Sequence, residues 1–150
     1  MTEITNDREF RAALDGLDAG QQRVLAAGFV KSVLHLCTDE RIARVLEVAG
    51  DPAASDAALA EALKTARATT FDCHTRCGSE GDWLEQAGYF VARATVAALT
   101  PLGQMPGGLA WQAAMSARMA QTSKSIVTGE SAAGQESENQ YRLLAGFLNS

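Results

Sequence analysis

Apolar residues recur every three or four positions along most of this chain, which is the spacing of one face of an α-helix. A wide apolar stripe from about Asp18 to Leu36 predicts a central helix. A second stripe follows an expected N-cap at Thr38 and ends before Gly50-Asp51-Pro52, a sequence typical of a helix end. We expect six or seven helices in all, over about residues 6–16, 18–36, 39–49, 55–77, 82–99, 109–128 and 136–148.

The predicted core faces of the last four helices differ in the size of their side chains. In the fourth helix the face combines leucines with smaller and sulfur-containing residues: Leu59, Leu63, Ala66, Thr70, Cys73 and Cys77. In the fifth it is mostly small, which lets a neighbouring helix approach closely: Leu84, Ala87, Val91, Ala94 and Ala98. In the sixth it is mostly large: Trp111, Met115, Met119, Thr122 and Ile126. The final helix presents Tyr141, Leu144, Ala145 and Leu148, and it is expected to dock back and close the core.

Composition supports an all-α fold. Alanine is abundant, only 3 prolines occur, and strand-like runs of Val, Ile, Tyr and Thr are absent. The connections are mostly short, so sequential helices should pack as antiparallel neighbours. A chain of 150 residues matches the common size of a single domain, and we expect residues 1–150 to form one helical bundle around one continuous core.

Charge and the N-terminal sequence restrict the expected partners. The chain has 13 basic and 18 acidic residues and a net charge of -5, which opposes binding to nucleic acid or to anionic membranes and favours a basic protein partner. Residues 1–7 contain neither a basic nor an apolar signal region, and no stretch of 18 apolar residues occurs, so we expect a cytoplasmic protein. No nucleotide-binding loop or other cofactor signature is present, and no cofactor is expected.

Cysteine and histidine residues form the first candidate site. Cys73, His74 and Cys77 are separated by short steps on one predicted helix, and with His35 and Cys37 they contain ligand types that zinc or copper accepts. A redox role is the second interpretation, because the imidazole of His74 and the guanidinium of Arg76 favour a thiolate. The third is that Cys73 and Cys77 are apolar core residues that continue the leucine stripe. Three cysteines in a chain without a secretion signal favour thiols over a disulfide framework.

Arg67 and His74 form a second candidate site. Their six-residue separation resembles the Arg-x(4-6)-His motif of HEPN ribonucleases, which are all-helical. That resemblance implies that His74 acts as an acid or base and that Arg67 stabilises a phosphorane. Ala68 stands where the motif usually has a polar residue.

The connection between the fourth and fifth helices is the densest cluster of polar and aromatic residues in the sequence. Asp82 and Glu85 have the spacing of a helix capping box, which is the structural interpretation of this segment. The functional interpretation is a recognition surface, because loops between rigid helices often bind partners and because Arg and Trp are frequent interface anchors. The binding residues we predict are Arg76, Glu80, Asp82, Trp83 and Tyr89.

Three stretches resemble the all-helical predicted immunity proteins of bacterial polymorphic toxin systems. They are residues 33–36 (VLHL) before an acidic helix, residues 87–94 (AGYFVARA), and residues 138–144 (ENQYRLL). The resemblance implies a small cytoplasmic bundle that binds and neutralises a toxin domain without chemistry of its own. The chain departs from the family at Tyr89 and Phe90, which replace smaller or His-bearing segments, and at Cys73 and Cys77, so no binding residue is transferred from the family.

Taken together, these features predict a non-catalytic protein-binding module that masks its partner. A thiol- or histidine-centred metal or redox sensor and a ribonuclease remain the alternatives. A structural homodimer is a third alternative, formed through the small face at Ala87, Val91, Ala94 and Ala98 or through the face at Trp111. The binding hypothesis depends on Cys73 and Cys77 facing inward as core residues.

Overall fold

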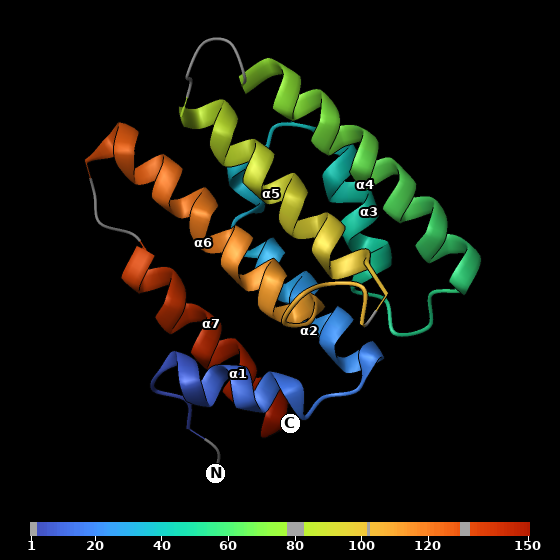
Figure 1. Ribbon diagram of the computed structural model, residues 1–150, viewed down its shortest axis with the longest axis vertical. Helices are drawn as coiled ribbons and strands as arrows, with labels where there is room; N and C mark the ends of the chain where they lie inside the picture. The colour runs from blue at the N-terminus through green and yellow to red at the C-terminus, as the bar shows by residue number, and fades with distance from the viewer. Residues whose placement is uncertain (1–2, 78–82, 102, 130–132) are drawn as a thin grey trace.

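The computed structural model describes residues 3–77, 83–101, 103–129 and 133–150. Within these ranges the chain forms seven α-helices and one turn of 3-10 helix, with no β-strand, which confirms the all-α prediction (Figure 1). No described helix combines the length and the apolar character needed to cross a membrane. The elements are α1 (Asp7–Asp15), α2 (Ala19–Lys31), η1 (Leu34–Leu36), α3 (Glu40–Ala49), α4 (Asp56–Cys77), α5 (Trp83–Leu99), α6 (Leu109–Thr128) and α7 (Ala133–Leu148).

The four longest helices, α4 to α7, lie side by side and alternate in direction across the molecule (Figure 1). Helix α2 lies behind this layer and packs against α5, α6 and α7, while α3 packs against α4 and α5. Helix α1 crosses the end of the bundle where the chain termini lie, in contact with α6 and α7 (Figure 1). The antiparallel arrangement follows from the short connections between successive helices.

Helices α5 and α6 form the most extensive helix pair, and their buried faces are built from small residues. Small side chains let two helix axes approach closely without leaving voids. The prediction for α5 is therefore right over residues 87–98, but the prediction for α6 is wrong: Met119 and Ile126 are 46% and 52% exposed. The residues that α6 buries are Leu109, Ala110, Ala113, Ala114, Ser116, Ala117, Ala120 and Ser123.

The buried apolar side chains form two clusters where one continuous core was expected. One cluster lies among α2 to α6, around Val30, Ile42 and Val91. The other joins α1 and α7 to the same central helices, around Phe10 and Leu144. Because α2, α5 and α6 contribute to both clusters, these three helices form the centre of the fold.

The predicted helix over residues 18–36 is interrupted. Helix α2 ends at Lys31, and the chain tightens into 3-10 geometry, with the Val33 amide donating to the Val30 carbonyl and the Cys37 amide to the Leu34 carbonyl. The hydroxyl of Ser32 donates to the Phe29 carbonyl at this end. The break turns η1 toward α5, so the apolar stripe continues while the helix does not.

Side chains satisfy backbone hydrogen-bonding groups at both ends of α3. The N-cap of α3 is Asp39, one residue later than predicted, and its carboxylate accepts from the Arg41 amide. At the other end of α3, Arg23 of α2 donates from Nε to the Ala49 carbonyl and from a terminal nitrogen to the Asp51 carbonyl. A cation is favourable at a helix C-terminus, so this contact fixes α3 against α2.

The core face of α4 is rotated from the predicted stripe. Ala62, Ala66, Thr69 and Cys73 are buried, whereas Leu59, Leu63 and Thr70 are half-buried. Thr69 satisfies its buried hydroxyl by donating to the Thr65 carbonyl. The smaller residues face inward because α4 packs closely on α5, while the leucines cover the edge of the contact.

A polar network fixes α1 to α6 and α7. The guanidinium of Arg118 donates to both carboxylate oxygens of Asp7, at 2.8 and 3.0 Å, and to the side-chain oxygen of the fully buried Gln140. Gln140 in turn donates to the Ala114 carbonyl, and the Tyr141 hydroxyl donates to Asp7. Hydrogen bonds from Arg118 hold the pKa of Asp7 below its ordinary value, while burial and the bond to Asp7 raise the pKa of Tyr141.

Overpacking tests the close contact of the central helices. Ala117→Leu adds a large side chain at a position with no exposed surface, so we expect the free energy of unfolding to fall by about 2 kcal/mol or more. The control is Ala68→Leu on the exposed face of α4, for which we expect a change within about 0.5 kcal/mol. Urea unfolding of both variants measures the difference, and equal effects would contradict close packing at Ala117.

The Asp7 network predicts a pH dependence of stability. Because the pKa of Asp7 is lowered in the folded protein, its contribution is complete above the unfolded pKa of about 3.9 and is lost as the pH falls through the folded pKa. Asp7 is 48% exposed, so we expect a contribution of about 1 kcal/mol or less. Urea unfolding from pH 7 to pH 2.5 should find Asp7→Asn less stable than wild type near neutrality and the two proteins convergent at the acid end. A constant difference at every pH would contradict this assignment.

Candidate functional site

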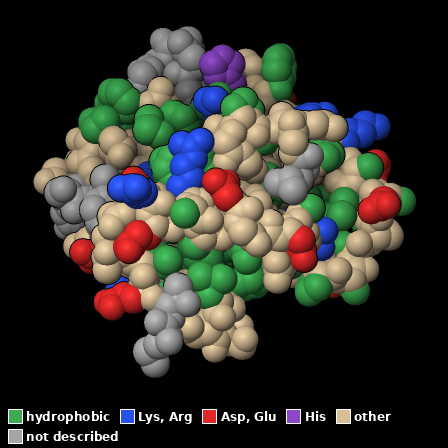
Figure 2. All heavy atoms as spheres, turned by 60° about the horizontal axis from the view of Figure 1, so that its bottom comes forward, with side chains coloured by type: hydrophobic (Ala, Val, Ile, Leu, Met, Phe, Trp, Pro, Cys, Tyr) green, Lys and Arg blue, Asp and Glu red, His purple; other side chains and the backbone are tan. Residues whose placement is uncertain are grey.

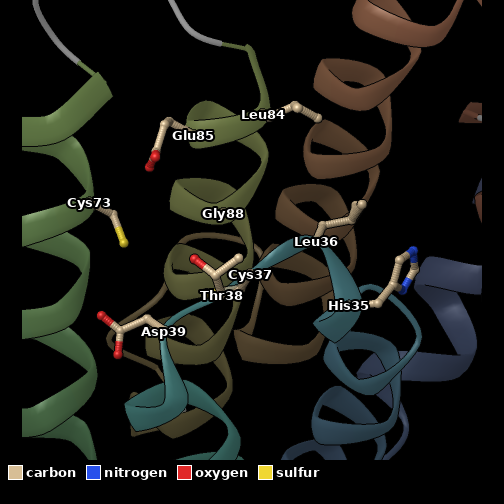
Figure 3. Close-up of a pocket in the computed structure, with 9 residues that line it drawn as sticks. All are labelled: His35, Leu36, Cys37, Thr38, Asp39, Cys73, Leu84, Glu85 and Gly88. Atoms are coloured by element: carbon tan, nitrogen blue, oxygen red, sulfur yellow. The ribbon is translucent and has the colours of Figure 1, made fainter.

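A pocket of about 340 Å³ lies between α4, α5 and the segment that joins η1 to α3 (Figure 3). It lies toward the end of the bundle where α4 ends and α5 begins (Figure 1). Apolar, thiol and carboxylate side chains share its wall. The lining residues are His35, Leu36, Cys37, Thr38, Asp39, Cys73, Leu84, Glu85 and Gly88.

Gly88 determines how closely the η1 segment approaches α5. A Cβ atom at this position would lie 3.5 Å from the Leu36 carbonyl oxygen and 3.8 Å from Cys37 Cα. The backbone of η1 therefore rests directly on the helix at this point. One turn earlier in α5, Leu84 is 53% exposed, so the contact at Gly88 marks where the cover over α5 ends.

The polar side of the pocket is formed by carboxylates from two elements. Figure 3 shows Glu85 of α5 and Asp39 at the start of α3 reaching toward the space beside the Cys73 sulfur. Arg41 donates to Asp39 at 2.7 Å and to Asp72 of α4 at 3.0 Å. The hydrogen bond to Asp39, which has the larger effect, and the hydrogen bond to Asp72 raise the pKa of the Arg41 guanidinium above its ordinary value. Arg41 thus joins α3 to α4 beside the pocket.

Four exposed apolar side chains lie beside this pocket end of the bundle, and we call them the end patch: Trp83, Leu84, Ile126 and Val127. Their exposed fractions are 42%, 53%, 52% and 50%. The start of α5 and the end of α6 lie at the same end of the molecule (Figure 1). Leu84 lies four and seven residues before the buried Gly88 and Val91, so it is on the same face of α5. Val127 lies four and seven residues after the buried Ser123 and Ala120, so it is on the same face of α6. Leu84 and Val127 therefore continue the buried faces of α5 and α6 into exposed positions.

The predicted binding residues are only partly brought together. Glu80 and Asp82, with the predicted capping box, lie outside the described residues, as does the side chain of Arg76. Trp83 is half-exposed at the first residue of α5, whereas Tyr89 packs on His74 of α4, with ring centroids 5.4 Å apart. Six residues of helix place Trp83 and Tyr89 on different faces, so Tyr89 does not join the end patch.

Cys73 and His74, two members of the predicted metal and thiol site, have different surroundings. Cys73 is 2% exposed and lines the pocket wall, while His74 is exposed on the side of α4 that meets Tyr89. The side chain of Cys77 lies outside the described residues. Among the residues that the structure describes, no three His, Cys, Asp or Glu side chains are placed to hold a metal ion. The inward orientation expected for Cys73 is confirmed.

Arg67 and His74 are both exposed on α4. Seven residues of helix place them on one face, separated by about 10 Å along the axis. The ring of His74 packs against the ring of Tyr89. The ribonuclease interpretation stays a prediction.

The sequence pattern predicts neither the pocket nor half of the end patch. Asp39 and Glu85 line the same cavity although 46 residues separate them, so no local motif connects them. One usable signal was Gly88, since a glycine inside an alanine-rich helix indicates close approach of another segment. Ile126 was placed in the core, and Val127 was not singled out.

No protein family, curated protein or solved structure that was compared with the chain matches it.

Two substitutions at Gly88 test the packing of η1 on α5. Gly88→Ala should raise the free energy of unfolding by about 0.5 to 1 kcal/mol, because the added methyl group meets only ordinary contacts and alanine favours the helix. Gly88→Leu should lower it, because a longer side chain must displace the backbone at Leu36 and Cys37. Chemical unfolding gives both values, and the same sign for the two variants would count against the observed contact.

Proposed function

We propose that this protein acts in the cytoplasm as a non-catalytic module that binds another protein through the end patch. The observation that carries the proposal is the position of Leu84 and Val127, which continue the buried faces of α5 and α6 while remaining about half exposed. Single exposed apolar side chains are common on protein surfaces, but apolar faces that continue from the core and end without cover are typical of interaction sites.

The energetics support binding at this patch. A partner that covered Trp83, Leu84, Ile126 and Val127 would remove four half-exposed large apolar side chains from water, each contributing roughly 1 kcal/mol. Trp83 adds an aromatic side chain of the kind enriched at interface centres.

Charge supports a protein as the partner in preference to nucleic acid. The chain carries a net charge of -5, which repels polyphosphates and attracts basic proteins. On the face drawn in Figure 2, acidic and basic side chains are interspersed, with hydrophobic areas between them. We further propose an immunity-type role, in which the bundle neutralises a toxin domain by masking it. The support for this role is the family resemblance of residues 33–36, 87–94 and 138–144.

The double variant Leu84→Glu with Val127→Lys tests the proposal. Each charge suits the helix dipole at its position, because Leu84 is in the first turn of α5 and Val127 in the last turn of α6, so we expect the melting temperature to change by only a few degrees. The matched control is Ala12→Lys with Ala68→Glu, on exposed faces of α1 and α4, which has the same net charge. Tagged forms are expressed in the native host, and co-purifying proteins are quantified by mass spectrometry.

We expect a protein that wild type and control enrich equally and that the double variant loses by at least about tenfold. Calorimetric titration of the purified partner then gives the affinity of each form, and co-expression tests whether wild type, but not the double variant, relieves growth inhibition by that partner. Equal affinity of all three forms would overturn the end patch as the binding surface. Light scattering distinguishes a homodimer: a dimeric wild type and a monomeric double variant identify a second copy of the chain as the occupant.

A further inference from the structure

A second pocket, of about 420 Å³, lies at the opposite end of the bundle from the end patch, where α5 ends and where α2, α4 and α6 begin (Figure 1). We propose that it binds a free α-amino acid with a large apolar side chain, such as leucine or methionine. The ligand carboxylate bonds to Arg23, its ammonium group bonds to Asp56, and its side chain covers the leucines of the wall. This site goes beyond the proposed function, because it takes a small molecule and lies apart from the end patch.

The wall of this pocket is mostly apolar. Leu99 of α5 and Leu109 of α6 are buried, while Leu59 and Leu63 of α4 are half-buried, so leucines from three helices line one space. The remaining uncharged lining residues have short side chains. A volume of about 420 Å³ is near the lower end of the range for small-ligand pockets, roughly 300 to 1,000 Å³, so the pocket suits a compact ligand.

Arg23 of α2 is the positive group of the pocket. Its guanidinium donates from Nε to the Ala49 carbonyl at 3.0 Å and from one terminal nitrogen to the Asp51 carbonyl at 2.7 Å. Carbonyl oxygens carry no net charge, so these bonds fix the guanidinium without pairing it to an anion. In the part of the chain that the structure describes, no carboxylate pairs with Arg23 and its other terminal nitrogen makes no hydrogen bond. That nitrogen can donate to a ligand carboxylate, and such charge-assisted bonds are stronger than neutral ones.

Asp56, the first residue of α4, is the negative group of the pocket. Among the described residues its carboxylate has no hydrogen bond or ion pair, and it does not pair with Arg23 across the pocket. A sphere of about 420 Å³ is about 9 Å across, which matches the roughly 8 to 9 Å that an α-amino acid spans when each charged group adds a hydrogen bond of about 2.8 Å. One amino acid can therefore bridge the two charges.

The two opposite charges select a zwitterion. A simple carboxylic acid would pair with Arg23 but face Asp56 as a like charge, and a simple amine would pair with Asp56 but face Arg23. An α-amino acid pairs with both. An apolar side chain on the same ligand then removes exposed surface of Leu59 and Leu63 from water. Small, polar or singly charged molecules lose at least one of these three contacts.

Nuclear magnetic resonance titration of the uniformly ¹⁵N-labelled full chain tests the inference. The probes are L-leucine, N-acetyl-L-leucine without the ammonium group, L-leucinamide without the carboxylate, and glycine without the apolar side chain, at pH 6.5, below the pKa of an α-amino group. We expect saturable shifts at the amides of Gly20, Leu63 and Leu99 with L-leucine, with a dissociation constant roughly in the millimolar range for a ligand of this size. Each of the other three probes should bind at least about threefold more weakly.

Asp56→Asn removes the negative charge with little change of shape and breaks no side-chain contact of the described residues. We expect it to weaken L-leucine binding about threefold or more, while N-acetyl-L-leucine binds as well as before or better. The matched control is Asp15→Asn, at an exposed aspartate of α1 outside the pocket, which should bind L-leucine as wild type does.

Three results would each overturn the inference: no saturable shifts at the pocket with L-leucine, equal binding of L-leucine and either singly charged analogue, or unchanged L-leucine affinity in Asp56→Asn. None of these measurements depends on partner capture through the end patch.

Discussion

The close packing of α5 on α6 is the constraint on which the rest of the structure depends. Their buried faces are composed largely of Ala, Gly, Ser and Thr, and small residues are what permit two helix axes to approach closely. Large side chains do not fit between the axes, so they lie at the edges and ends of the pair. The exposure of Met119 and Ile126 is a direct result of this arrangement.

Polar contacts as well as apolar burial hold the outer helices in place. Arg118 joins α6 to Asp7 of α1 and to Gln140 of α7. On the opposite side, Arg23 satisfies the carbonyl groups at the end of α3. Each cation is held by several acceptors in defined geometry, which fixes orientation more than it adds stability. The small-residue centre sets the distance between helices, and the polar contacts set their direction.

The candidate site arises where this architecture ends. The η1 segment covers α5 only as far as Gly88, and beyond that point the buried faces of α5 and α6 continue into exposed apolar side chains. The same break in the chain that ends α2 early also brings Asp39 toward Glu85 and opens the pocket. The surface proposed for protein binding and the pocket beside it are thus two consequences of one shortened covering segment.

Local pattern was sufficient for the class of fold and for much of its detail. Periodicity alone predicted six or seven helices, the small inward face of α5, and the inward orientation of Cys73 and Leu144, because each depends on residues within one or two turns. The sequence pattern predicts neither the rotation of α4 nor the exposed stripe of α6. It favours burial of the large apolar side chains, whereas the close approach of α5 requires small residues at the buried positions of both helices. The pocket was missed because Asp39 and Glu85 meet only through the contact of η1 with Gly88. The sequence determined the helices and their apolar faces through short-range spacing, whereas the extent to which those faces are covered depends on distances between helices, which only the tertiary structure decides.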